Sequence, residues 1–372
     1  MKVAGRFFKM VRQYFLLAAI ATFVLSVAGV ALADSLLIKD QGSFFVGGHT
    51  IFTDTLTGMV AGFPGTNINS GHITVDQMYV QYQIPEGGEA HVPVVMVHGC
   101  CLSSKSYETT PDGRMGWNEY FLRKKRAVYL PDQVSRARSG FDSTIFNQVK
   151  LGKRPATDLP EIRTASYEIA WGLFRFGPEL GKPFANEQFP VEAFDEFGKQ
   201  VIPDLNAALP AVNPTWTNLS ALAIKLHGAI LMGHSESGFF PEETAMLNPA
   251  DIRGLITIEI GCTADLSAEK ISTLAKIPTL IVFGDHLDDA PEPYGERWRS
   301  RFKDCLTFIQ QVNKAGGDAT MMHLPDFHQF GNSHMLMQDK NNLQIADLIL
   351  KWIDEHVENK KKAAVSASNK KS

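Results

Sequence analysis

The feature that most constrains the fold is a series of short apolar runs that recur along the chain. The clearest runs cover residues 92–97, 127–130, 229–232, 255–260 and 279–283, and a weaker one covers residues 319–324. Continuous apolar runs of this length are typical of strands that are buried on both faces. Helix-like segments separate most of the runs and lie at residues 117–125, 219–227 and 302–315, and a last amphipathic helix covers about residues 343–356. This alternation predicts an α/β fold with a mostly parallel central sheet flanked by helices.

Two intervals depart from the alternation. Residues 34–90 are rich in Gly, Thr and Asn, and their clearest period-two pattern, at residues 73–84, predicts N-terminal antiparallel strands. Residues 143–216 contain no clear buried strand but many prolines and aromatic residues. Connections between strands are usually much shorter, so we interpret residues 143–216 as a helical cap insertion that forms an apolar pocket over the sheet edge. Extra helices that pack on the core are the alternative.

The two ends of the chain differ from its middle. Four basic residues precede an apolar run at residues 14–33, which ends in the A-x-A pattern of Ala31 and Ala33. This pattern predicts a signal peptide at residues 1–33 with cleavage after Ala33, and therefore a periplasmic or secreted protein. The run is nearly long enough to span a bilayer, so an uncleaved anchor is the alternative. We expect residues 34–358 to form the domain and residues 359–372 a disordered basic tail.

Charge and cysteine content exclude several classes of function. The formal net charge is −4, and removal of the four N-terminal basic residues makes the chain more acidic. We therefore expect no nucleic-acid partner and, after signal cleavage, no membrane partner. The cysteines Cys100, Cys101, Cys262 and Cys305 have no zinc-like spacing with histidines, so we expect no metal and no cofactor. In an oxidising compartment, all four can pair.

Ser235 is the candidate nucleophile. It lies in the sequence GHSESG at residues 233–238, between the apolar run at residues 229–232 and an amphipathic stretch. A strand, a tight turn and a helix form the nucleophile elbow of α/β-hydrolases, whose usual pattern is G-x-S-x-G. Ser237 takes the second small position of that pattern. The helix after this turn would stabilise negative charge near the Ser235 hydroxyl.

The apolar run at residues 92–97 ends in His98-Gly99, where this fold places an oxyanion donor. The backbone N–H groups of Cys100 and Glu236 are the two candidate donors. Adjacent Cα atoms are about 3.8 Å apart, whereas disulfides usually require roughly 4.4 Å or more, so geometry alone favours two thiols at Cys100 and Cys101.

A serine nucleophile needs a histidine base and an acid that orients the histidine. In this fold the base follows the last strand, where His323, His328 and His334 are found. His323 falls within the apparent strand, but spacing does not separate His328 from His334. For the acid, Asp285 and Glu259 both lie at the ends of apolar runs. The position of Asp285 is the commoner one and is slightly favoured on these grounds.

Longer motifs resemble one specific family. The chain is similar to bacterial α/β-hydrolase-fold esterases that have a vicinal disulfide next to the oxyanion hole. The similar stretches are residues 94–101 (VVMVHGCC), 109–117 (TTPDGRMGW), 174–178 (FRFGP), 234–238 (HSESG), 331–335 (GNSHM) and 337–350. They are far more specific than G-x-S-x-G, and the similarity covers most of the chain after residue 33.

The resemblance implies a catalytic set. Ser235 would be the nucleophile, His334 the base and Glu259, instead of Asp285, the acid. The segment that contains Asp132, Arg136, Arg138 and Ser139 also resembles the family, and we expect it to support the loops of the site; direct contact with the substrate is the alternative.

The resemblance also implies that Cys100 and Cys101 are bridged, and that the N–H groups of Cys100 and Glu236 form the oxyanion hole. Cys262 would then be free to pair with Cys305. One position departs from the family, which has Gln where this chain has Glu236. We expect the Glu236 side chain to point away from the oxyanion, toward water, because a carboxylate is costly to bury.

These observations predict a serine carboxylic-ester hydrolase that acts through an acyl-enzyme on a small or medium, partly apolar ester. A lactonase, amidase or acyltransferase with the same three residues is the alternative. A non-catalytic binding protein is disfavoured, because none of the three residues is lost. The expected partner is a small-molecule ester, and homodimer formation is left open.

Overall fold

The computed structural model describes residues 35–55 and 70–359. The chain divides into a unit of residues 1–37 and a unit of residues 38–372, and the sheet, its helices and the candidate site all belong to the second unit. The predicted signal peptide and all of the predicted tail except Asn359 lie outside the described residues. Within the described ranges, no helix combines the length and the apolar character that crossing a bilayer requires.

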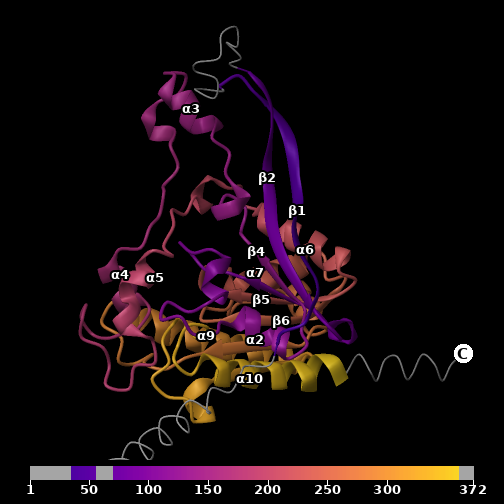
Figure 1. Ribbon diagram of the computed structural model, residues 1–372, viewed down its shortest axis with the longest axis vertical. Helices are drawn as coiled ribbons and strands as arrows, with labels where there is room; N and C mark the ends of the chain where they lie inside the picture. Colours follow the sequence, from indigo (N-terminus) through magenta and orange to yellow (C-terminus); the bar gives the residue numbers. More distant parts are fainter. Residues whose placement is uncertain (1–34, 56–69, 360–372) are drawn as a thin grey trace, which may run out of the picture. The chain divides into compact units, whose positions relative to one another are not determined.

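A central sheet organises the described residues (Figure 1). Its eight strands follow the order β1-β2-β4-β3-β5-β6-β7-β8. They are β1 (Ile38–Thr53), β2 (Gly71–Pro85), β3 (Val94–Val97), β4 (Val128–Pro131), β5 (Ala229–His234), β6 (Ile252–Ile258), β7 (Thr279–Phe283) and β8 (Ala319–His323). Strands β3 to β8 pair in parallel, whereas β2 is antiparallel to both β1 and β4. The predicted α/β-hydrolase arrangement, with antiparallel strands at its N-terminal edge, is confirmed.

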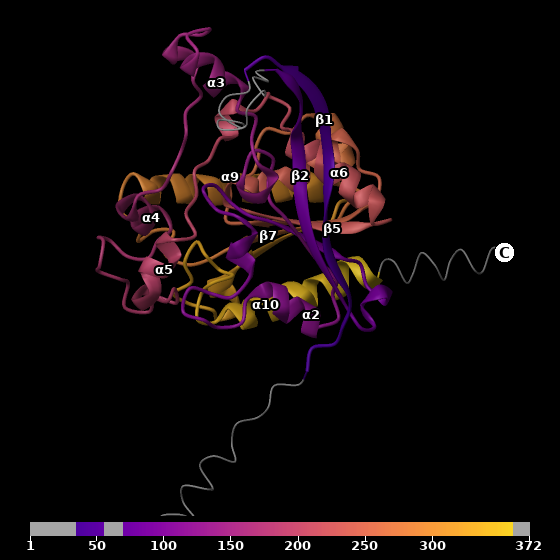
Figure 2. The ribbon, with the colours of Figure 1, turned by 45° about the horizontal axis from the view of Figure 1, so that its top comes forward.

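Burial explains why the parallel strands are apolar throughout. Every residue of β3, β5 and β7 is buried, because helices cover both faces of the sheet. The helices α2 (Trp117–Arg123) and α10 (Asn342–Ile353) contact each other on one side. On the other side, contacts link α6 (Pro214–Lys225), α7 (Phe240–Leu247), α8 (Ala268–Leu274) and α9 (Tyr294–Lys314) in turn (Figure 2).

The long interval between β4 and β5 contains the short helices α3 (Thr144–Lys150), α4 (Tyr167–Leu173) and α5 (Phe194–Gly198), and then leads into α6. Its aromatic side chains form a small core of their own. The rings of Phe176 and Phe189 stack with centroids 4.1 Å apart, and Trp171, Phe194 and Phe197 surround them. These rings are buried against one another, so they stabilise the insertion itself.

A disulfide joins Cys262, just beyond β6, to Cys305 in the middle of α9. It ties the loop at the carboxyl end of β6 to a helix 43 residues further along the chain. The carboxyl ends of β3, β5 and β6 meet at the same edge of the sheet, since these strands are parallel neighbours. That edge is where open α/β sheets bind their ligands.

Candidate active site

Ser235 occupies the turn that the elbow pattern predicts. It follows the last residue of β5, begins a short 3-10 turn (Ser235–Phe239) and has a φ of 56°, in the left-handed region that few non-glycine residues adopt. The β3 loop lies directly against it, because a Cβ atom on Gly99 would approach Ser235 Cβ to 2.8 Å. Ser237, which replaces the usual glycine, donates from Oγ to Val97 O at 2.8 Å and so ties the elbow to β3.

The structure brings His334 to the candidate nucleophile. Its Nε2 atom lies 2.8 Å from Ser235 Oγ, and its Nδ1 atom lies 3.2 Å from Glu259 Oε2. Of the competing histidines, His323 is at the end of β8, where its Nδ1 lies 3.6 Å from Asp326 Oδ2. His328 follows a 3-10 turn and makes no described contact with Ser235. His334 is thus the histidine that the fold places beside the hydroxyl.

The two candidate acids have different surroundings. Glu259, one residue beyond β6, is fully buried and has a positive φ of 56°, which turns its side chain toward His334. Asp285 instead accepts hydrogen bonds from the backbone N–H groups of His286 and Gly331, at 2.8 Å and 2.7 Å. Asp285 therefore holds the loop that precedes His334. Its position along the sequence favoured Asp285 as the acid, but the carboxylate that lies against the His334 imidazole is that of Glu259.

Glu259 also contacts a buried arginine. Arg175 Nη2 donates to Glu259 Oε1 at 2.7 Å, and the Gly284 N–H donates to the same oxygen. Burial by itself would raise the pKa of Glu259, but Arg175 and His334 outweigh it and lower this pKa to about 2. Burial lowers the pKa of His334 to about 4, although the Glu259 carboxylate opposes this shift. Near neutral pH, an ionised carboxylate thus faces a neutral imidazole that can accept a proton.

The imidazole of His334 is held on several sides. The ring of Phe174 stacks on it at a centroid distance of 4.8 Å, and the ring of Trp298 lies 4.9 Å away. The backbone N–H of His334 donates to Phe174 O at 2.9 Å, and His234 Nε2 lies 2.9 Å from His334 O. These contacts fix the ring in the orientation that proton transfer requires.

Glu236 does not point to water. Its carboxylate accepts hydrogen bonds from Arg136 Nη2 and Asn206 Nδ2, both at 3.2 Å, and its side chain is only 13% exposed. The same Arg136 Nη2 lies 2.7 Å from Asp204 Oδ1. Burial raises the pKa of Glu236, with Arg136 acting in the opposite direction. The expectation of a solvated carboxylate is therefore wrong, because a buried guanidinium supplies the partner that water would otherwise provide.

The segment that was expected to support the loops makes such contacts. Asp132 accepts hydrogen bonds from the N–H and hydroxyl of Ser104 and from Arg138 Nε. Ser139 Oγ donates to Asp132 O at 2.7 Å and accepts a hydrogen bond from the Tyr79 N–H. These bonds connect the β3 and β4 loops to β2.

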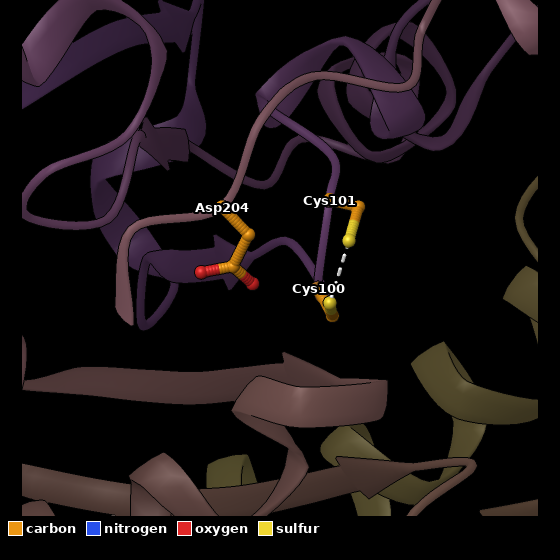
Figure 3. A group of neighbouring side chains, drawn as sticks. All are labelled: Cys100, Cys101 and Asp204. Carbon is orange, nitrogen blue, oxygen red and sulfur yellow. Dashed lines mark hydrogen bonds between the residues drawn. The ribbon is translucent and has the colours of Figure 1, made fainter. Parts of the chain in front are cut away.

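Cys100 and Cys101 lie side by side next to Asp204 (Figure 3). Their Sγ atoms are 2.8 Å apart, and both residues are thiols in this structure. A disulfide bond measures about 2.05 Å, so the predicted bridge is not formed here. Among the described residues, these three form one group whose donor atoms lie within 4.8 Å of one another, close enough to hold a metal ion. The Asp204 carboxylate already pairs with the Arg136 guanidinium, which balances its negative charge. This group therefore suits a metal cation poorly.

Sequence reasoning did not assign a role to Arg175. Arg175 appeared only as part of the FRFGP stretch at residues 174–178. The sequence did indicate that Glu259, a carboxylate among apolar residues, needs a buried partner. The partner is 84 residues away in the chain, and one sequence alone offers no signal that pairs these two positions. Trp298, on α9, was missed for the same reason.

Comparisons with known proteins identify relatives of this chain. A scan against protein-family models gave no match. A bacterial esterase of solved structure is 46% identical, with a TM-score of 0.80 over 87% of this chain and 98% of that chain. A probable secreted lipase, phiG, from a fungal species (strain ATCC 74256) is 24% identical over 334 residues, which cover 75% of this chain and 86% of the lipase. The chain therefore belongs to the family of this bacterial esterase, a family of carboxylic-ester hydrolases with the α/β-hydrolase fold.

Proposed function

We propose that the protein is a serine esterase in which Ser235 is the nucleophile, His334 the general base and Glu259 the acid. The observation that carries this proposal is the continuous chain of contacts from Ser235 Oγ to His334 at 2.8 Å, and from His334 to Glu259 at 3.2 Å. The order Ser, acid, His along the sequence is the order that this fold uses.

The reaction can be derived from these contacts. Ser235 Oγ attacks the ester carbonyl while His334 Nε2 takes its proton, and the ionised Glu259 stabilises the imidazolium. The imidazolium then gives the proton to the departing alcohol, which leaves an acyl-enzyme. Water, activated by the same imidazole, releases the acid and regenerates Ser235. The backbone N–H groups of Cys100 and Glu236 would hold the oxyanion, each contributing about 3 kcal/mol.

The substrate we propose is a small or medium, partly apolar ester. The aromatic rings of Phe174 and Trp298 against His334 support an apolar environment close to the reacting atoms. The same three residues would also open lactones, cleave amides or transfer an acyl group to an alcohol. A panel of esters, lactones and amides that vary in chain length would rank these activities by kcat/KM.

We also propose that the protein is exported. The Cys262–Cys305 disulfide supports this, because disulfides persist in oxidising compartments. The relative phiG is named as a secreted lipase, which agrees. In that setting Cys100 and Cys101 would be oxidised to the vicinal bridge. Thiol titration of the unfolded protein tests this: zero free thiols per chain supports the bridge, and two free thiols would contradict it.

Labelling with a fluorophosphonate tests the nucleophile. We expect one adduct per chain, located on Ser235 by peptide mass spectrometry, and complete loss of hydrolysis on labelling. The variant Ser235→Ala should take up no label and should lose about 10³-fold or more in kcat while keeping its fold. Hydrolysis by Ser235→Ala at the wild-type rate would rule out the proposal.

A further inference from the structure

Arg175 connects the insertion between β4 and β5 to the acid of the proposed triad. It lies two residues after the end of α4, is fully buried and has a φ of 60°. Its Nη2 donates to Glu259 Oε1 at 2.7 Å, and its Nε donates to Asp285 O at 2.8 Å. One planar guanidinium thus bridges Glu259 and the loop beyond β7. A lysine ammonium, which is a compact point charge, cannot make these two hydrogen bonds with the same geometry.

The neighbouring residue contacts the base. Phe174 stacks its ring on His334 and accepts the His334 N–H on its carbonyl oxygen. Two consecutive residues of the insertion therefore touch two different members of the triad. The left-handed conformation at Arg175 lets both side chains face the site, and such a conformation is costly for a non-glycine residue.

The charged and titratable groups around His334 come from four elements. Glu259 follows β6, Arg175 follows α4, Arg301 lies on α9 and His234 ends β5. Arg175 and Arg301 lie 4.7 Å and 5.1 Å from the ring centroid of Trp298, whose ring contacts His334. The Glu259 carboxylate favours an imidazolium, whereas the two cations oppose it.

We propose that Arg175 is a positioning residue: its guanidinium holds the Glu259 carboxylate in place against His334 and puts a fixed positive charge beside this pair. This inference rests on the proposed triad. It gives the insertion a role in the chemistry, because the cation that balances the acid comes from the insertion and not from the sheet.

The test compares pH profiles of kcat/KM for a neutral ester. In Arg175→Met the positive charge is lost, so the acidic limb should move to higher pH by about one unit or more, and kcat on the plateau should fall about 10- to 100-fold. Arg175→Lys keeps the charge but not the fork, so its limb should stay near that of the wild type while its kcat falls. The matched control is Arg126→Met, since Arg126 is equally buried and paired with Glu358 far from the triad. Arg126→Met should lower the stability of the protein without moving the acidic limb of the kcat/KM profile.

The outcomes separate this inference from the proposed function. Fluorophosphonate labelling of wild-type Ser235 tests the triad alone, so failure to label it would defeat the proposed function. If Ser235 is labelled and Arg175→Met keeps the wild-type limb and plateau, the role of Arg175 is refuted. If circular dichroism shows that Arg175→Met does not fold, Arg175→Lys decides between the outcomes. A wild-type kcat in Arg175→Lys would contradict the positioning role. An acidic limb of Arg175→Lys that moves by as much as one pH unit would contradict the effect of the charge.

Discussion

The guanidinium group of Arg136 lies 3.2 Å from the carboxylate of Glu236, the residue that directly follows Ser235. Resemblance to the esterase family places a neutral Gln at this position, so the carboxylate adds a negative charge beside the site where an oxyanion would form. Arg136 and Asn206 hold both of its oxygens. The backbone N–H of Glu236 can then serve the reaction while its charge is balanced elsewhere.

We therefore expect Arg136→Met to lower kcat by about 10- to 100-fold at alkaline pH, where Glu236 stays ionised without its partner, because an unbalanced carboxylate next to the oxyanion raises the barrier. Glu236→Gln alone should change kcat by no more than about threefold, and Arg136→Met should cost less in the Glu236→Gln background. Arg136→Met removes the partner of Asp204 in both backgrounds, so this effect cancels in the double-mutant cycle. Steady-state kinetics of the four proteins measures the coupling, and equal losses in both backgrounds would show that Arg136 does not act through Glu236 but through its other partners, Asp204 and Gly99 O.

The second prediction concerns the acidic limb of the wild-type profile. The proposed base, His334, works when it is neutral, so kcat/KM should be at its plateau well above the pKa of His334 and fall as the pH drops through about 4. The pKa of Glu259, lowered to about 2, keeps the acid ionised over this whole range. Hydrolysis of an uncharged ester from pH 3.5 to 8 checks the limb, with circular dichroism at each pH to verify folding. A midpoint at the ordinary histidine value near 6.5 would contradict the environment described for His334.

The sequence predicted the sheet well because each parallel strand is buried on both faces and therefore reads as an unbroken apolar run. It predicted Ser235 for a related reason, since strand, turn and helix are local features. The acid could not be decided locally: Asp285 and Glu259 both follow strands, and only the fold shows which carboxylate faces His334. The resemblance to known esterases, not the spacing, favoured Glu259, which is the carboxylate that lies against His334.

The same limit applies to contacts between distant segments. Arg175 and Glu259 meet because the insertion folds back on the sheet edge, and no periodic pattern records that approach. The side chain of Glu236 was wrongly expected in water, because its partner Arg136 lies 100 residues earlier in the chain. Local physical rules thus predicted elements and their order, whereas pairings of buried charges required the structure.

The third prediction concerns the Cys262–Cys305 disulfide. It closes a long loop between β6 and α9, so it restricts the unfolded chain considerably. The double variant Cys262→Ser/Cys305→Ser should lose about 2 to 4 kcal/mol of unfolding free energy, measured by urea denaturation. Neither Glu259 nor His334 has a described contact with this bridge, so kcat at 25 °C should stay close to the wild-type value. A loss below about 0.5 kcal/mol would show that the bridge contributes little to stability.

The last prediction concerns Glu242, a buried carboxyl group in the first turn of α7. One of its oxygens has no hydrogen-bond partner among the described residues, and burial raises its pKa to about 8. The Glu242 carboxyl ionises near pH 4.5 in the unfolded chain but not in the folded protein, so the folded state loses stability as the pH rises from about 4.5 to about 8.

The substitution Glu242→Gln removes this loss of stability. We expect the variant to be about 2 to 4 kcal/mol more stable than the wild type at pH 8.5 and nearly equal to it at pH 4.5. Glu243→Gln is the comparison variant: Glu243 is half-buried, contacts Lys270 at 2.8 Å and adds to the raised pKa of Glu242, so its removal should give only a smaller part of the gain at pH 8.5. Urea unfolding at both pH values measures the difference, and a Glu242→Gln gain that is the same at pH 4.5 and pH 8.5 would show that ionisation of this carboxyl is not its cause.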